Sequence, residues 1–333
     1  MAHELATISG KAAMMYVGQV PWHGLGTALK SPATAAEAIR AASLDWQVVK
    51  SPLYFEHGKA KHPVHHRFAM VRDDLLKLAG PPPVLGIVGA EYKPLQNREA
   101  FEWFDPIVGE GAAIYHTAGA LGGGERVWIL AKLPDDIRVV GDDIAHKYLL
   151  LSNSHDGSSS VQVKFTPVRV VCQNTLTMAL NQGQGVRIPH TRNLKDRLVA
   201  ARAALGIIHR RFEGITTDFK SLAGIQLNQD RLGLYLSKVF PMPADPEDIK
   251  GRSRAQLARE KSAHLFREGV GNTKPPVLGT LWAAYNGVTE YVDHAMKYGD
   301  AERRLNAIWF GGGYLTKARA FRLAMENAAD WKN

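Results

Sequence analysis

Cysteine is almost absent from the 333-residue sequence, which holds only Cys172. A single cysteine excludes an intrachain disulfide and a zinc site built from several thiolates, and it fits a reducing compartment. The sequence also lacks any run near the roughly 18 uninterrupted apolar residues of a membrane-spanning helix. Its first residues, Met-Ala-His-Glu-Leu-Ala-Thr, lack the basic start and apolar stretch of a secretion signal. We therefore expect a cytoplasmic protein that does not enter a membrane.

Acidic residues are scarcer than basic ones. The sequence has 32 Asp and Glu against 41 Lys and Arg, which gives a formal net charge of +9 and a pI near 9.5. This excess attracts polyanions and is typical of nucleic-acid binders, although many basic cytosolic proteins bind no nucleic acid. The hydrophobic fraction of 45% and the charged fraction of 22% are those of an ordinary globular protein. The composition therefore predicts a folded protein with a basic surface.

Hydrophobic patterns predict an α+β fold. Between residues 112 and 170, apolar runs alternate with turns rich in Gly, Asp and Ser, which is typical of an antiparallel sheet. Strands near Val127, Lys147 and Val161 precede a helix near Asn174, and together they form a β-β-β-α core. A mostly helical C-terminal region follows this core.

Composition divides the chain into three parts. Residues 1–185 form the α+β core, residues 186–240 form a helical extension, and residues 241–333 form a linker and a helical C-terminal region. The linker is Pro241-Met-Pro-Ala-Asp-Pro, and we expect the polar, basic stretch after it to be mobile. Within the core we expect a hairpin between residues 46 and 72. The spacing of apolar residues predicts helices over 34–44, 229–239, 254–266, 278–297 and 317–327, and Asn97 is predicted to cap a further helix.

Histidines crowd the predicted hairpin at positions 57, 62, 65 and 66. Imidazole is the commonest transition-metal donor, so this grouping raises the possibility of a metal site. The spacing is irregular, however, and neither a carboxylate pair nor an HExxH helix accompanies it, which favours an exposed hairpin tip. We assign no metal ligand and no cofactor.

No catalytic constellation emerges from the remaining motifs. Ser154, His155 and Asp156 are the residue types of a catalytic triad, but consecutive side chains cannot converge as nucleophile, base and orienting group, so a turn is predicted. The glycines at 122–124 separate two predicted strands and fit a hairpin turn. We therefore assign no catalytic residue.

The strand-to-helix segment 165–180, together with Lys164 just before it, is the most informative part of the sequence. Lys164 and Arg169 lie on an extended segment, and Asn174 and Thr175 stand at a helix start, where free N–H groups bind phosphate. Such a group of residues can hold a nucleic-acid backbone without reading its sequence. On the residues alone, an equal alternative is that Asn174 and Thr175 only cap the helix and Arg169 pairs with a carboxylate.

Five ordered motifs give the sequence a family resemblance. They are Pro21-Trp-His-Gly-Leu-Gly, Tyr92-Lys-Pro-Leu-Gln-Asn, Ser152-Asn-Ser-His-Asp-Gly-Ser, Thr166-Pro-Val-Arg-Val-Val-Cys-Gln-Asn-Thr-Leu and Gly279-Thr-Leu-Trp-Ala-Ala-Tyr-Asn-Gly-Val-Thr-Glu-Tyr. With these motifs the sequence resembles, over nearly its whole length, the phage/plasmid-like proteins that carry domain of unknown function 932. This resemblance implies no activity, although its phage and plasmid setting implies work on DNA.

The β-β-β-α order is similar to the core of the single-strand annealing proteins, a superfamily that includes Red-beta, RecT, Erf and the Rad fifty-two type. This similarity implies a homo-oligomeric ring or filament that binds single-stranded DNA in a basic groove. It also implies ATP-independent annealing of complementary strands in phage or plasmid recombination. Two alternatives stay open: a metal-dependent enzyme acting on nucleic acid, and a phage-encoded protein that binds and blocks a host factor.

The predicted DNA contacts follow from this hypothesis. Lys164, Arg169, Asn174 and Arg187 are expected to touch the phosphate backbone, Arg192, Lys195 and Arg197 to extend the basic surface, and Tyr148 and Phe165 to stack on bases.

Overall fold

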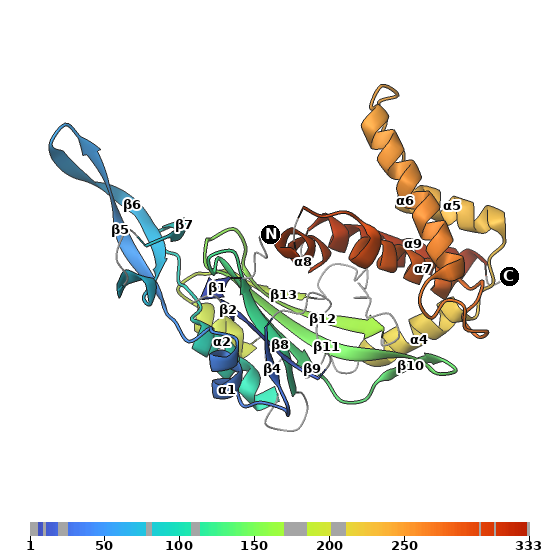
Figure 1. Ribbon diagram of the computed structural model, residues 1–333, viewed down its shortest axis with the longest axis horizontal. Coiled ribbons are helices and arrows are strands. Elements are labelled where there is room, and N and C mark those ends of the chain that lie inside the picture. The colour runs from blue at the N-terminus through green and yellow to red at the C-terminus, as the bar shows by residue number, and fades with distance from the viewer. Residues whose placement is uncertain are drawn as a thin grey trace.

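The computed structural model describes residues 6–8, 11–18, 26–77, 82–107, 114–169, 185–200, 211–299, 301–309 and 311–331. In this part of the chain, antiparallel sheets dominate the N-terminal half and helices the C-terminal half (Figure 1). The predicted α+β fold class is therefore confirmed.

The largest sheet has the strand order β13-β12-β11-β9-β8-β3-β4, and β10 pairs with β11 off this path. All of its pairs are antiparallel except β3 with β4. The predicted β-β-β unit corresponds to β9, β11 and β12, whereas the helix predicted near Asn174 lies outside the described residues. The strands are β3 (Met14–Val17), β4 (Thr27–Leu29), β8 (Ile114–Leu121), β9 (Arg126–Lys132), β10 (Ile137–Val140), β11 (Asp143–Ser154), β12 (Val161–Arg169) and β13 (Gly185–Ile188), and a small separate sheet pairs β1 (Thr7–Ile8) with β2 (Lys11–Ala12).

The two faces of the large sheet carry different cores, because side chains alternate between the faces along each strand. On one face, Tyr115, Ile129 and Leu149 belong to a core that includes Phe101 and Phe104 of α2 (Asn97–Ile107) and residues of α1 (Ala35–Ala41). We call this the α2 face. On the opposite face, Met14, Trp128, Leu130, Tyr148 and Leu150 form a smaller cluster with Trp309 of α8 (Ala301–Trp309) packed against it. We call this the α8 face.

The predicted hairpin is confirmed as an arm that extends from the body (Figure 1). It consists of β5 (Val48–His57) and β6 (Ala60–Arg72), and β7 (Val84–Gly89) adds a third strand near its base. The pairing is irregular between Pro52 and Tyr54, where His66 adopts a left-handed backbone with a φ of 61°. This irregularity separates the outer hairpin from the inner part of the sheet.

The C-terminal helices enclose α7 (Leu281–Glu290), in which every residue is buried and which continues as a π-helical turn, Tyr291–Ala295. Trp282 and Tyr285 of α7 share one core with Phe219, Tyr235 and Phe321 of the surrounding helices. The predicted division of the chain near residue 240 therefore does not coincide with a break in this core. The surrounding helices are α4 (Arg211–Ala223), α5 (Gln229–Val239), α6 (Ile249–Glu268) and α9 (Gly312–Trp331).

Local signals located several helices well. Helix α5 covers the predicted range, and Thr34 caps α1 through a reciprocal pair of hydrogen bonds with Glu37. After the proline-rich linker, where we expect a mobile stretch, the chain is helical from Ile249 onward. There Asp248 accepts a hydrogen bond from the Gly251 N–H at 2.8 Å and starts α6.

Candidate nucleic-acid interface

Cationic side chains gather on the α8 face of the large sheet. Lys164 of β12 and Arg187 of β13 point to this face, since they continue the alternation set by the strand pairing, and Arg126 of β9 does the same. The Lys164 ammonium lies 4.4 Å from the ring centre of Tyr314 in α9. Arg126 donates a hydrogen bond to the side-chain oxygen of Asn306 in α8. The cations thus lie where the sheet meets the C-terminal helices.

The electrostatics of this cluster favour an anion. Burial and, to a smaller extent, the nearby positive charges of Arg187 and Arg126 together lower the pKa of the Lys164 amine to about 8. A bound phosphate would oppose both effects, because an opposite charge stabilises the protonated amine. The structure therefore brings together two of the predicted contacts, Lys164 and Arg187. It adds Arg126 and Tyr314, which sequence reasoning missed because their faces depend on strand pairing and on helix docking.

The other predicted backbone contacts of the segment from Lys164 to Thr175 fall wholly or partly outside the described residues. Arg169 is the last residue of β12 and pairs with Ala145 of β11, but its side chain is outside the described part of the structure. Asn174 also lies outside the described residues. The roles of Arg169 and Asn174 as backbone contacts therefore stay predictions.

The predicted extension of the basic surface does not adjoin Lys164. Arg192 pairs with Glu91 at 2.7 Å, and Lys195 pairs with Glu99 of α2 at 2.9 Å. The segment that carries them is helical from Leu194 onward and contributes Leu194 and Leu198 to the core of the α2 face. Arg192 and Lys195 thus lie on the side of the sheet opposite to Lys164. Exposed Arg197 belongs to the same helical segment.

The structure argues against the predicted base-stacking residues. Tyr148 is 4% exposed, because its ring is part of the buried cluster on the α8 face. Phe165 packs against both large cores of the molecule. Tyr148 is therefore closed to a nucleic-acid base, and Phe165 is engaged in core packing.

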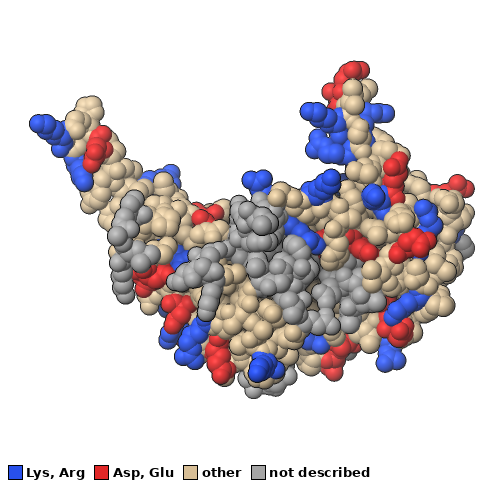
Figure 2. Space-filling model, in the orientation of Figure 1, with Lys and Arg blue, Asp and Glu red and all other residues tan. Residues whose placement is uncertain are grey.

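Helix α6 carries a basic surface that sequence reasoning missed. Lys250, Arg254 and Lys261 are exposed and spaced by four and seven residues, which places them on one helical face over about 17 Å. The helix projects from the body, and Figure 2 shows its Lys and Arg side chains gathered on this projection. Among the described residues, none of its exposed cations forms an ion pair; these are Lys250, Arg252, Arg254, Lys261 and Arg267. The spacing of Lys250, Arg254 and Lys261 in the sequence is the signal from which this basic surface could have been predicted.

The four hairpin histidines are exposed on the arm. His62 stacks on Phe55, with ring centres 5.2 Å apart, and the rings of His65 and His66 are 6.5 Å apart. Within the described ranges, no three or more His, Cys, Asp or Glu side chains are grouped to hold a metal ion. The geometry therefore gives no support to a metal site on this hairpin.

Two of the ordered sequence motifs meet in a buried polar network. The Tyr92 hydroxyl donates to the Ser154 carbonyl at 2.6 Å, and the Asn153 side chain donates to the Leu95 carbonyl at 2.9 Å. His155 is fully buried, and burial lowers its pKa to about 3. Its Nε2 atom lies 3.1 Å from the Asn97 side-chain oxygen. These motif residues therefore join the sheet to the segment before α2, and Ser154, His155 and Asp156 do not form a triad.

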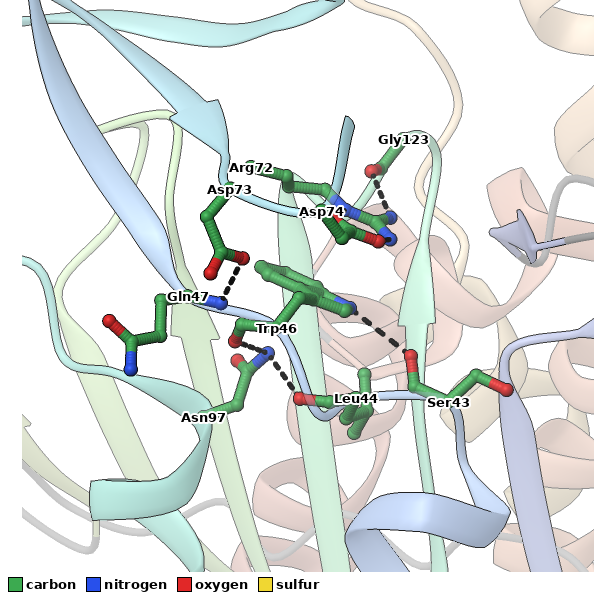
Figure 3. A network of polar contacts seen from close by, with 9 residues as sticks. All are labelled: Ser43, Leu44, Trp46, Gln47, Arg72, Asp73, Asp74, Asn97 and Gly123. Atoms are coloured by element: carbon green, nitrogen blue, oxygen red, sulfur yellow. Dashed lines mark hydrogen bonds and ion pairs between the residues drawn. The ribbon is translucent and has the colours of Figure 1, made fainter. Parts of the chain in front are cut away.

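Asn97 extends this network to the base of the hairpin arm (Figure 3). Its side chain donates to the Leu44 carbonyl at 3.0 Å, next to Trp46, whose ring lies 4.4 Å below the Arg72 guanidinium. Arg72 in turn donates to the Gly123 carbonyl at 2.9 Å. The prediction of Asn97 as an N-cap is wrong, because α2 includes Asn97 and its side chain binds the 44–46 loop instead.

Fold and surface together define an α+β protein with cations on one face of its main sheet and a basic projecting helix. The family described as "Domain of unknown function (DUF932)" matches residues 84–309, more than half of the chain, so the chain belongs to this family. No solved structure matches the chain. Of the described helices, none combines the length and the apolar character that crossing a membrane requires.

Proposed function

We propose that this protein binds single-stranded DNA along its sugar–phosphate backbone and promotes the annealing of complementary strands without ATP. The observation that carries the proposal is the convergence of Lys164, Arg187 and Arg126 on the α8 face. Close like charges are unfavourable, and a polyanion relieves this repulsion.

The distribution of charge supports a contact with the backbone rather than with base edges. The cations of α6 follow one helical face, so successive phosphates of one strand can bind along it. Backbone contacts carry no sequence information, and they leave base edges available to a complementary strand. Annealing needs both features, a strand held by its backbone and base edges that a second strand can reach.

Exposed aromatic side chains on the arm support a single strand rather than a duplex. Tyr54 is 60% exposed and Phe55 is 54% exposed, and Lys59 and Lys61 lie close by in the hairpin. Unpaired bases stack on such rings, whereas paired bases are already stacked within the duplex. Assembly into a ring or filament belongs to the same proposal, because a strand held by several subunits gains affinity through multivalency.

The test is binding of a mixed-sequence DNA strand by fluorescence anisotropy between about 50 and 300 mM salt, followed by an annealing assay. We expect the affinity to fall steeply with salt. The double variant Lys164→Gln/Arg187→Gln should bind at least about tenfold more weakly, since it neutralises two fewer phosphates.

The matched control is Arg192→Gln/Lys195→Gln, which removes the same charge from the opposite side of the sheet. Equal loss of binding in both double variants would show that only net charge matters. Affinity independent of salt, or annealing no faster with the protein than without it, would contradict the proposal.

A further inference from the structure

The cations of the α8 face meet at the β13 edge of the main sheet. Lys164 of β12 pairs with Gly185 of β13, and Gln162, two residues earlier, pairs with Arg187. Lys164 and Arg187 are therefore diagonal neighbours on one face, close enough for long side chains to reach each other. The Lys164 ammonium lies 4.4 Å from the Tyr314 ring centre. Burial raises the pKa of the Tyr314 hydroxyl, and the nearby charge of Arg187 partly offsets this rise. We give the name cation site to Lys164, Arg187, Tyr314 and Arg126.

The sheet is closed to a DNA strand on the inner side of the cation site. Across the sheet, Lys164 is followed on the same face by Leu150 of β11 and Leu130 of β9. These two side chains are 2% and 4% exposed, and they belong to the cluster against which Trp309 of α8 packs. Arg187, on the outer side, is exposed. A strand that reaches Lys164 over Arg187 therefore cannot continue across the sheet, which suits the end of a strand.

Helix α9 begins beside the Lys164 ammonium, because Tyr314 is the third residue of this helix. Its first backbone hydrogen bond runs from the Leu315 N–H to the Gly311 carbonyl at 3.1 Å. The three N–H groups before Leu315 have no carbonyl partner within the helix and form the positive end of its dipole. The first turn holds no acidic residue, and a Cβ atom at Gly312 would meet no atom of the described residues within 4 Å. The start of α9 therefore adds positive charge and accessible donors to the cation site.

A terminal phosphate suits this concentration of positive charge better than an internal phosphate does. An internal phosphodiester carries a single negative charge, whereas a phosphate monoester carries about 1.5 to 2 negative charges near neutral pH and has three strong acceptor oxygens. The larger charge offsets more of the repulsion among the three cationic side chains and the positive end of the helix. The third oxygen also gives the N–H groups of α9 an acceptor of their own.

We propose that the cation site binds the terminal phosphate of a DNA strand. Lys164 and Arg187 bind the phosphoryl oxygens through charge-assisted hydrogen bonds, and the N–H groups at the start of α9 donate to the same oxygens. Arg126, which donates a hydrogen bond to Asn306, adds to the positive potential. A strand without a terminal phosphate binds these cations more weakly, through an internal phosphate. Affinity for long DNA rests on the proposed function, whereas recognition of the terminal phosphate needs only the cation site.

The first test compares three forms of one DNA strand, with a 5′-phosphate, with a 3′-phosphate, and with hydroxyl groups at both ends. A fluorophore on an internal base leaves the ends accessible, and anisotropy at constant salt gives the affinities. We expect at least one phosphorylated form to bind about tenfold more tightly than the hydroxyl form, which corresponds to one added charge-assisted hydrogen bond. The better phosphorylated form identifies the end that the site binds. Equal affinities of all three forms would overturn the proposal.

A charged substitution at the start of α9 locates the bound phosphate. Gly312→Glu places a carboxylate at a helix N-terminus, where it stabilises the helix and repels a phosphate. This variant should fold and should lose the advantage of the phosphorylated strand, and Lys164→Gln should lose that advantage as well. The matched control Gly233→Glu, in α5, makes the same change where an added Cβ also meets no described atom within 4 Å, and it should keep the advantage. Equal advantages in Gly312→Glu and Gly233→Glu would place the terminal phosphate elsewhere and overturn the proposal.

Dinucleotides separate this proposal from the proposed function. Thymidylyl-thymidine with the same three kinds of ends is too short to follow the basic face of α6, so calorimetric titration with it reports on the terminal phosphate alone. Binding of a phosphorylated dinucleotide by a protein that does not bind long strands would support the cation site and contradict the proposed function. Salt-dependent binding of long strands with no preference among the ends would overturn the terminal-phosphate proposal and leave the proposed function intact.

Discussion

The indole N–H of Trp282 donates a hydrogen bond to the Asp143 carboxylate at 2.7 Å, and both side chains are fully buried. Trp282 lies on the central helix α7, and Asp143 is the first residue of β11. This bond therefore joins the C-terminal helices to the main sheet. It fixes the position of α7 relative to the strand that carries Tyr148 and His146.

Replacing Trp282 by Phe should destabilise the protein. The substitution takes the indole donor from a buried carboxylate, which costs about 2 to 3 kcal/mol in the free energy of unfolding. Urea denaturation measures the loss. The control is Trp331→Phe near the end of α9, which should change stability by less than about 1 kcal/mol because Trp331 is only partly buried. Equal effects of the two substitutions would mean that the bond contributes little.

Stability should fall as the pH drops from about 6.5 to about 5. Burial lowers the pKa of His155 to about 3 and that of His116 to about 4, and it also lowers the pKa of His190. In this window the unfolded chain takes up protons at His116 and His155 and the folded chain does not, and the lowered pKa of His190 acts in the same direction. The stabilisation is therefore fully present above the pKa of histidine in the unfolded chain. As the pH falls below that pKa, each histidine lowers the free energy of unfolding by up to about 1.4 kcal/mol per pH unit.

Denaturation series at several pH values test this dependence. His116→Gln should reduce the slope of stability against pH, because one of the titrating groups is gone. His264→Gln, at an exposed position of α6, should leave the slope unchanged. A free energy of unfolding that stays constant or increases as the pH falls from 6.5 to 5 would contradict the assignment of His116 and His155 as neutral in the fold.

DNA binding should strengthen as the pH falls from 9 to 7. The Lys164 amine has a pKa of about 8 in the free protein, and a bound phosphate favours its protonated form. Binding then takes up a proton above pH 8, and the affinity changes by up to about tenfold per pH unit. Lys164→Arg should bind with little pH dependence, since a guanidinium stays charged throughout this range. The same pH dependence in both proteins would place the binding site elsewhere.

Neutralising the basic face of α6 should weaken DNA binding and its salt dependence. In Arg254→Gln/Lys261→Gln, the slope of log affinity against log salt should become shallower by about 0.7 for each phosphate that the variant no longer neutralises. The control Lys220→Gln/Lys238→Gln removes the same charge from exposed positions of α4 and α5. An unchanged slope in the α6 variant, with binding intact, would exclude the helix from the interface.

The secondary structure followed closely from local sequence. The hairpin between residues 46 and 72, the glycine turn at 122–124 and helix α5 have strong local signals, such as turn residues and apolar periodicity, and the structure confirms them. Asn97 shows the limit of such signals. A residue type suited to an N-cap binds the carbonyl of Leu44, which lies 53 positions earlier in the chain.

The sequence by itself determined the α+β class, the basic character of the protein and its family motifs, because composition and periodicity express them directly. Only the tertiary structure decided which cations act together. Lys164 and Arg187 share the α8 face with Arg126, whereas Lys195 pairs with α2 on the other side of the sheet. The physical reason is that strand register and helix docking set the face to which a side chain points, and neither is encoded within a short segment.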